Sequence, residues 1–154
     1  ETEESAAGRW EGDDVLSGGA GNDEINGNED DDHLTGGGGS DTIVGGSGND
    51  KMWGDYEASD DIAGEKLPAN APHVLQVGGE DVFVFETGSG HDEIWDFRRT
   101  EDTLDLRGYG YGDVLDIVWS WQGDDILIDL DGTADDIASI LIIGGDIYYS
   151  DILI

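Results

Sequence analysis

The chain has 154 residues, enough for one domain with a modest core, and its 38 Asp and Glu against 6 Lys and Arg give a formal net charge of -32 at pH 7. This charge opposes a compact state unless cations bind, and it excludes nucleic acid and anionic membrane surfaces, which are bound through clusters of Lys and Arg. The absence of cysteine excludes disulfides and thiolate metal sites, and no run of about 18 apolar residues is present that could span a membrane.

Residues 1–8 carry no pattern and are expected to form a lead-in or the end of a linker. The N-terminal sequence ETEESAAGRW lacks the basic and apolar regions of a secretory signal peptide, so an address for export would have to lie elsewhere. Because the chain starts at Glu1 without Met, we expect it to be the C-terminal piece of a longer polypeptide.

A period of nine residues runs through residues 9–63 and is clearest in GGAGNDEIN, GNEDDDHLT, GGGGSDTIV and GGSGNDKMW. One Asp recurs at every ninth position, and an apolar residue follows each Asp two places on. The acidic series is Asp14, Asp23, Asp32, Asp41 and Asp50, and the apolar series is Leu16, Ile25, Leu34, Ile43 and Met52. Two residue types in phase over so many positions indicate a structural repeat, not a flexible Gly/Asp-rich linker.

The repeat is irregular at three places. Residues 9–17 keep the Asp and the apolar residue but lack the glycine pair, as expected of a terminal repeat. In residues 27–35, Asn28 and Asp30 stand where the other repeats have glycine; both types tolerate the left-handed region, so we expect the turn to survive. Beyond the last glycine-rich block, one inserted residue would bring Asp60 into phase.

Residues 64–77 contain both prolines and no repeat, and we expect a surface excursion there. The period then returns in residues 78–107, where Asp81 and Asp92 take the acidic position. These degenerate repeats are expected to complete the repeated structure.

Residues 108–154 change to a period of two, which predicts an antiparallel β cap. Apolar residues alternate with other residues at Leu115, Ile117, Trp119 and Trp121, and a hairpin turn is expected at Gly123 to Asp125. Returning strands are expected at residues 126–130 and 140–143. The alternation of the aromatic residues favours a position in the core, and a sugar-stacking surface is the alternative.

The nonapeptides, followed by VGGEDVFVFETGSGHDEIWDF and EDTLDLRGYGYGD, resemble the C-terminal region of RTX (repeats-in-toxin) proteins. This family includes secreted metalloproteases, lipases, haemolysins, adhesins and alginate epimerases. The resemblance covers about residues 9–154 and implies an all-β fold: a right-handed parallel β-roll of nonapeptide repeats, followed by the antiparallel cap. Two nonapeptides form one coil, so Asp14, Asp32 and Asp50 would stack on one edge, and Asp23, Asp41 and Asp60 on the other.

Stacked carboxylates repel one another, and calcium would remove the repulsion because it takes six to eight oxygen ligands from carboxylates and backbone carbonyls. Zinc prefers nitrogen and sulfur, and magnesium requires a small octahedron. We expect about four to six Ca²⁺ ions. Their side-chain ligands would be Asp14, Asp23, Asp32, Asp41, Asp50, Asp60, Asp81 and Asp92, and their carbonyl ligands Gly18, Ala20, Gly27, Glu29, Gly36, Gly38, Gly45 and Ser47.

Other constellations point less clearly to a site. Three histidines, His33, His73 and His91, share no metal-binding spacing, so we expect them at the surface. Arg98, Arg99 and Arg107 hold half of the positive charge; pairing with nearby carboxylates is favoured over binding of an anionic ligand or a polysaccharide. Nothing singles out two of the 38 acidic residues as a glycosidase pair, and we expect no catalytic residue.

The resemblance also implies a function. The chain would be a non-catalytic calcium-binding module, unfolded at low calcium and folded by calcium outside the cell, that supports type I secretion and the folding of an upstream effector domain. Export would proceed through the type I secretion apparatus without an N-terminal signal peptide, and the secretion signal would include Asp151, Ile152, Leu153 and Ile154. The alternative is a polysaccharide- or surface-binding module, similar to those of alginate epimerases or adhesins.

Overall fold

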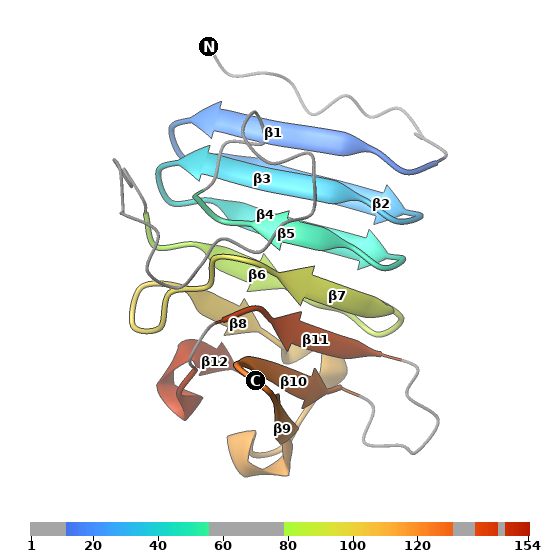
Figure 1. The fold of residues 1–154 in the computed structure, drawn as a ribbon, viewed down its shortest axis with the longest axis vertical. Coiled ribbons are helices and arrows are strands. Elements are labelled where there is room, and N and C mark those ends of the chain that lie inside the picture. The colour runs from blue at the N-terminus through green and yellow to red at the C-terminus, as the bar shows by residue number, and fades with distance from the viewer. Residues whose placement is uncertain (1–11, 56–78, 131–137, 145–146) are drawn as a thin grey trace.

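A computed structural model describes residues 12–55, 79–130, 138–144 and 147–154 of the chain. Within them the strands stack as successive rungs, from β1 at one end to β9 at the other (Figure 1). The strands are β1 (Val15–Ala20), β2 (Glu24–Glu29), β3 (His33–Gly38), β4 (Thr42–Ser47), β5 (Lys51–Trp53), β6 (Val82–Val84), β7 (His91–Ile94), β8 (Thr103–Asp105), β9 (Val118–Gln122), β10 (Asp125–Asp129), β11 (Ser139–Ile142) and β12 (Ile152–Leu153).

Consecutive repeats alternate between two parallel sheets. One sheet has the order β1-β3-β5-β7-β11-β10-β9, and the other has β12-β8-β6-β4-β2. The register between paired strands of intact repeats is two repeats, because Val15 lies beside His33 and Glu24 lies beside Thr42. Two nonapeptides therefore form one coil, as expected of a β-roll.

The core is the space between the two sheets, and the apolar position of each repeat fills it. Leu34, Ile43 and Met52 are fully buried, and so are their counterparts Phe83 and Ile94 in the degenerate repeats. Each such side chain contributes about 1.5–3 kcal/mol relative to an exposed one. The apolar series recognised in the sequence is thus the inner seam of the roll.

Glycine positions two and four of each repeat have positive φ, for example 96° at Gly19 and 119° at Gly21. In the irregular repeat, Asn28 and Asp30 take the same conformation with φ of 83° and 78°. The expectation that this turn survives is confirmed, because Asn and Asp enter the left-handed region more readily than other residues with a side chain. Residues 24–29 accordingly form a strand of the same length as those of the intact repeats.

One turn of the roll is interrupted by residues 56–78. These residues, which include Asp60 and His73, lie outside the described part of the chain. Gly54 and Asp55 begin this turn and Gly79 to Asp81 end it. Strand β6 still pairs with β4, with Thr42 beside Val82, so the expected return of phase is confirmed. The place next to Asp41 in its column, which was expected for Asp60, is taken by Asp81.

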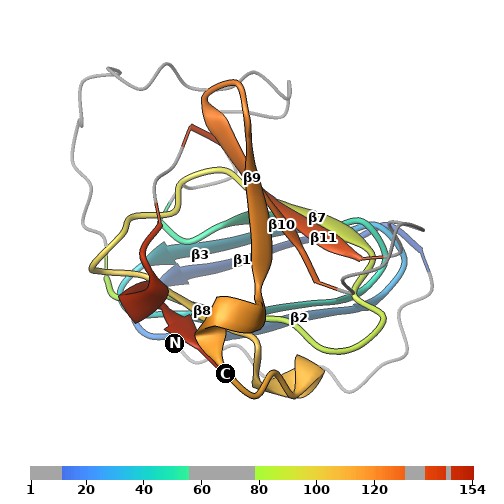
Figure 2. The same ribbon diagram turned by 90° about the horizontal axis from the view of Figure 1, so that it is seen from below.

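The C-terminal strands only partly follow the expected antiparallel cap. The β9–β10 hairpin and the antiparallel β10–β11 pair are confirmed, with Gly123 at φ 76° in the turn. However, β11 pairs in parallel with β7, and β12 in parallel with β8, so these strands extend the two sheets of the roll. Seen from below, β9 crosses the end of the roll (Figure 2).

Short 3₁₀ turns connect the last strands. They are η1 (Arg107–Tyr109), η2 (Val114–Asp116) and η3 (Tyr149–Asp151). The strand expected to include Leu115 is therefore shorter than its alternation suggested, because Asp113 caps the start of η2, and this turn contains Leu115 and ends just before β9 begins. Within the described residues, no helix has the length and apolar character needed to cross a membrane.

Candidate metal sites in the turns

Two columns of aspartates run along the edges of the roll, one on each side. In the first column, the amides of Asp14, Asp32 and Asp50 each donate to Oδ1 of the next aspartate, at 2.7, 2.9 and 2.9 Å, and Asp92 ends the series. In the second, the amides of Asp23, Asp41 and Asp81 do the same at 2.9, 2.8 and 3.2 Å, ending at Asp102. The stacking expected from the period of nine is present, and the structure adds Asp102.

In six of these carboxylates the second oxygen has no hydrogen-bond partner. Oδ2 is buried without a hydrogen bond in Asp23, Asp32, Asp41, Asp50, Asp81 and Asp92. A buried polar atom without a partner is costly, and an ionised oxygen is more so. Each turn therefore presents an unsatisfied negative oxygen toward the interior, which is the chemistry that a bound cation would complete.

The first glycine of the repeat leaves room beside that oxygen. A Cβ on Gly27 would come closer than 3.0 Å to both Asp32 Oδ2 and the carbonyl oxygen of Gly45. The same holds for Gly18 with Asp23 and Gly36, and for Gly36 with Asp41 and Gly54. In each of these three turns, one point thus lies next to a carboxylate oxygen and to a carbonyl oxygen of the coil below.

Three turns show this complete pairing, and two more show half of it. A Cβ on Gly45 or Gly54 would meet only the carboxylate of Asp50 or Asp81 among its nearest atoms. Sequence reasoning named the carbonyls of Gly36 and Gly45 but missed Gly54, which occupies the same repeat position one residue after the last intact nonapeptide. The Gly38 carbonyl accepts a hydrogen bond from the Gly21 amide at 2.7 Å, and the remaining carbonyls stay predictions as ligands.

The donor set fits calcium. Among the described residues, no three His, Asp or Glu side chains converge into a metal-binding group, so an ion in a turn would take most of its shell from backbone oxygens. A shell of carbonyls with few carboxylates is typical of Ca²⁺, whereas Zn²⁺ sites use nitrogen and sulfur side chains. His33 and His91 are exposed, as expected.

Burial raises the pKa of three carboxyl groups in the middle and at the lower end of the columns. It is raised to about 6 for Asp50, about 7 for Asp81 and about 8 for Asp92, mainly by desolvation and further by the neighbouring aspartates, against the lowering effect of the backbone amide that each accepts. The ionised columns are therefore unfavourable near neutral pH without a cation. Calcium would favour the ionised form and reverse this penalty.

The turns and the two-repeat register define a parallel β-roll whose edges present stacked carboxylate and carbonyl oxygens. Residues 11–43 and 26–55 match the family model of the RTX calcium-binding nonapeptide repeat (4 copies). The segment from residue 11 to residue 55 therefore consists of RTX calcium-binding repeats.

A solved structure shows the same fold. The chain is similar to the AlgE6R3 subunit of the Azotobacter vinelandii mannuronan C5-epimerase, with 23% identity and a TM-score of 0.60 over 92% of this chain and 78% of that one. It also matches the extracellular lipase LipA from Serratia marcescens, with 19% identity and a TM-score of 0.46, over 91% of this chain but only 20% of the lipase. Comparison with curated proteins finds no match.

The position of an aspartate in its column should determine how much it contributes to calcium binding. Asp32 accepts the Asp14 amide and donates to Asp50, and its second oxygen faces Gly27, whereas Asp14 ends the column. We expect Asp32→Ala to weaken calcium binding at least about tenfold, or ~1.4 kcal/mol, and Asp14→Ala to weaken it less. Calorimetric titration of both variants checks this, and equal losses would contradict the stacking of sites.

The raised pKa values predict opposite pH responses with and without calcium. In chelator, the folded form binds more protons than the unfolded chain, so its free energy of unfolding rises as pH falls through these pKa values. We therefore expect β-sheet circular dichroism to increase between about pH 8 and about pH 5 in chelator. In calcium, protons compete with the ion, and the calcium midpoint should rise over the same range. A β-sheet signal that decreases on acidification in chelator would refute this assignment.

Proposed function

We propose that this chain is a calcium-dependent folding module: it is unfolded at low calcium, folds on binding about four to six Ca²⁺ outside the cell, and supports the folding of an upstream domain. The observation that carries the proposal is the set of six buried Oδ2 atoms without a partner, which line the two edges of the roll. The carbonyl groups at the first and third positions of the repeat would complete the ligand shells of the bound ions. The formal charge of -32 opposes folding in the same way until cations bind.

The proposed ligands follow from the columns. The side-chain ligands are Asp23, Asp32, Asp41, Asp50, Asp81 and Asp92, with Asp14 as a weaker terminal one. Extracellular calcium modules bind at about 10⁻⁴ to 10⁻³ M, far above the concentration inside cells, so sites of this class would switch the module on export. No residue of the chain is assigned a catalytic role.

The C-terminal residues support a role in export before folding. Asp151 and Ile152 are buried, and Ile152–Leu153 forms strand β12 beside β8. Within a secretion signal at Asp151 to Ile154, the first two residues would thus be accessible only in the unfolded chain, whereas Leu153 and Ile154 are exposed in the fold. Calcium-triggered folding after passage through a type I apparatus satisfies that requirement.

Removal of calcium should unfold the repeats. Each repeat buries one apolar side chain for nine ordered residues, so about 1.5–3 kcal/mol from burial cannot offset about 1–2 kcal/mol of backbone entropy per residue. We expect far-UV circular dichroism of a largely disordered chain in excess chelator near neutral pH, and a cooperative gain of β signal on adding calcium but not magnesium. Full β signal in chelator would overturn the proposal.

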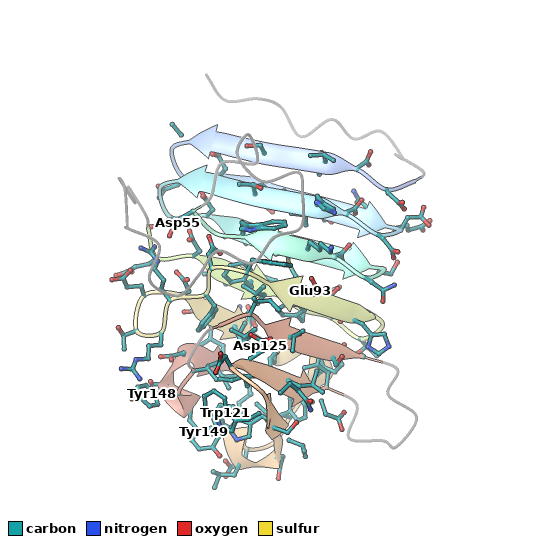
Figure 3. All side chains as sticks on the ribbon, in the orientation of Figure 1. Asp55, Glu93, Trp121, Asp125, Tyr148 and Tyr149 are labelled. Atoms are coloured by element: carbon teal, nitrogen blue, oxygen red, sulfur yellow. The ribbon has the colours of Figure 1, made fainter. Side chains whose placement is uncertain are left out.

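A second candidate function is binding of a polysaccharide, and exposed aromatic side chains favour it. Trp119, Trp121, Tyr148 and Tyr149 line a groove of about 370 Å³ with Ser120, Ile126 and Ile147 at the C-terminal end of the roll. Figure 3 shows the labelled members of this aromatic groove gathered there. The expectation that these aromatics face the core is wrong for Trp121, which is 65% exposed.

The groove has features of a sugar platform. Trp119 stacks on Tyr149 with ring centroids 5.0 Å apart, and Arg99 donates from Nη1 to the Tyr148 hydroxyl at 2.7 Å. Flat aromatic faces with polar edges suit ligands that have one apolar face and several hydroxyl groups. Such a surface on a protein this acidic favours neutral glycans or glycans held through calcium.

Titration of the calcium-loaded protein with mannuronan and with a neutral glycan tests this second function. We expect chemical-shift changes at the Trp119 and Trp121 indoles with one of them, and their loss in Trp121→Ala, with the calcium response unchanged. Shifts absent for both glycans, or retained in Trp121→Ala, would reject the groove as a binding site.

A further inference from the structure

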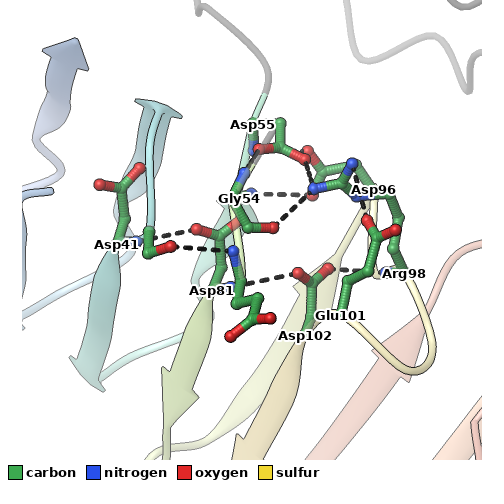
Figure 4. A network of polar contacts seen from close by, with 11 residues as sticks. Asp41, Gly54, Asp55, Asp81, Asp96, Arg98, Glu101 and Asp102 are labelled. Atoms are coloured by element: carbon green, nitrogen blue, oxygen red, sulfur yellow. Dashed lines mark hydrogen bonds and ion pairs between the residues drawn. The ribbon is translucent and has the colours of Figure 1, made fainter. Parts of the chain in front are cut away.

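Arg98 closes the turn that residues 56–78 interrupt (Figure 4). Its Nη2 donates to the Gly79 carbonyl at 2.9 Å and also pairs with Asp55 Oδ2. Gly79 in turn donates its amide to Asp55 Oδ1 at 3.0 Å. The guanidinium therefore bridges the residue that begins the interruption and the residue that ends it.

The same arginine is anchored to the coil below. Its amide donates to Asp102 Oδ2 at 2.7 Å, and its Nη1 pairs with Glu101 at 3.0 Å. The neighbouring Asp96 accepts the amides of Gly54 at 2.8 Å and Asp55 at 3.0 Å. Three segments far apart in the sequence thus meet through one side chain, which is only 22% exposed.

None of the four turns between Gly18 and Asp50 has such a cation. The turns at residues 18–23, 27–32, 36–41 and 45–50 contain neither Lys nor Arg. In each of them consecutive residues run directly from the first glycine to the aspartate, so the chain itself keeps the two halves together. In the interrupted turn that continuity is lost, and closing a long loop costs entropy that grows with its length.

Both halves of this turn belong to candidate calcium sites. The Gly54 carbonyl lies next to Asp41 Oδ2 at the point that a Cβ on Gly36 would occupy, and Asp81 Oδ2 lies next to Gly54. The Asp41 amide also donates to Asp81 Oδ1 at 2.8 Å. If the two halves separated, the carbonyl and the carboxylate of these sites would separate as well.

We propose that Arg98 is a positioning residue for calcium: its guanidinium holds Gly54–Asp55 against Gly79–Asp81, so that the Asp41 and Asp81 sites keep their binding geometry. The inference rests on the proposed calcium function. A planar guanidinium can serve Asp55, Gly79 and Glu101 at once, which the single ammonium of lysine reproduces only in part. In this turn the Arg98 guanidinium keeps the two halves together, as the continuous chain does in an uninterrupted turn.

Arg98→Ala tests the inference, with Arg107→Ala as a control that removes the same charge from an exposed arginine that pairs with the buried Asp105, outside the interrupted turn. Amide exchange at intermediate calcium should show lost protection at Asp41 and Asp81, on the column that contains the interrupted turn. Protection at Asp32 and Asp50 on the opposite column should remain. The calcium midpoint of the affected sites should rise about tenfold, with Arg98→Lys between wild type and Arg98→Ala.

Other outcomes would overturn the inference. Arg98→Ala behaving like Arg107→Ala would show that the guanidinium has no role in calcium binding, and equal loss on both columns would show a general structural role. Where Arg98→Ala does not fold at any calcium concentration, Arg98→Lys decides by the same comparison of columns. Absence of calcium binding by the wild-type chain would refute the proposed function itself, which separates the two failures.

Discussion

The structure depends on one constraint: each coil buries two carboxylates, and each lies directly above the next one of its column. Successive turns of a β-roll are separated by the spacing between its strands, so a charged residue at a fixed position of the turn lies over the same charge in the next coil. Here one oxygen of a carboxylate such as Asp50 caps the amide of the coil before it, and in six of the aspartates the other oxygen is buried without a hydrogen-bond partner. An ion that binds between coils resolves the repulsion and links neighbouring coils at the same time, which couples the order of one coil to that of the next.

The distribution of glycine follows from the same constraint. The second and fourth glycines provide positive φ, a requirement that Asn28 and Asp30 also meet. The first glycine has a different role, because Gly27 and Gly36 provide space beside the carboxylate and not an unusual conformation. Small polar residues occupy the second and fourth positions of the irregular repeat, but a Cβ would come closer than 3.0 Å to a backbone oxygen, and a side chain is therefore excluded, at Gly37, Gly39, Gly46 and Gly48. The first position excludes a side chain at Gly18, Gly27, Gly36, Gly45 and Gly54. The irregular repeat obeys this distinction: it keeps Gly27 and varies only the other two.

The sequence was sufficient to predict the features that recur in every nonapeptide. The period of nine located the buried apolar seam, the two columns of aspartates and the strands up to Trp53, because each feature depends on residues within one nonapeptide. It could not locate Asp81 next to Asp41 in the column, since the register across residues 56–78 is set by pairing of β4 with β6. Arg98 and Gly54 were missed as parts of one turn for the same reason. The exposure of Trp121 was mispredicted because alternation identifies the two faces of β9 but not which of them another layer covers.

At the C-terminal end of the roll, buried apolar side chains take the place of the stacked carboxylates. Below Asp92 in the first sheet comes Ile140 of β11, which is fully buried, so the column of carboxylates ends where the strand pairing continues. The residues around it, Ile126, Ile128 and Ile142, are also buried and belong to an antiparallel arrangement that covers the end of the core. Burial of several large side chains over few residues stabilises this end more than the single apolar residue of each nonapeptide stabilises the repeats. The chain thus joins repeats whose stacked carboxylates oppose order without a cation to an end where apolar packing dominates, and the Arg98 turn lies where these two regions meet.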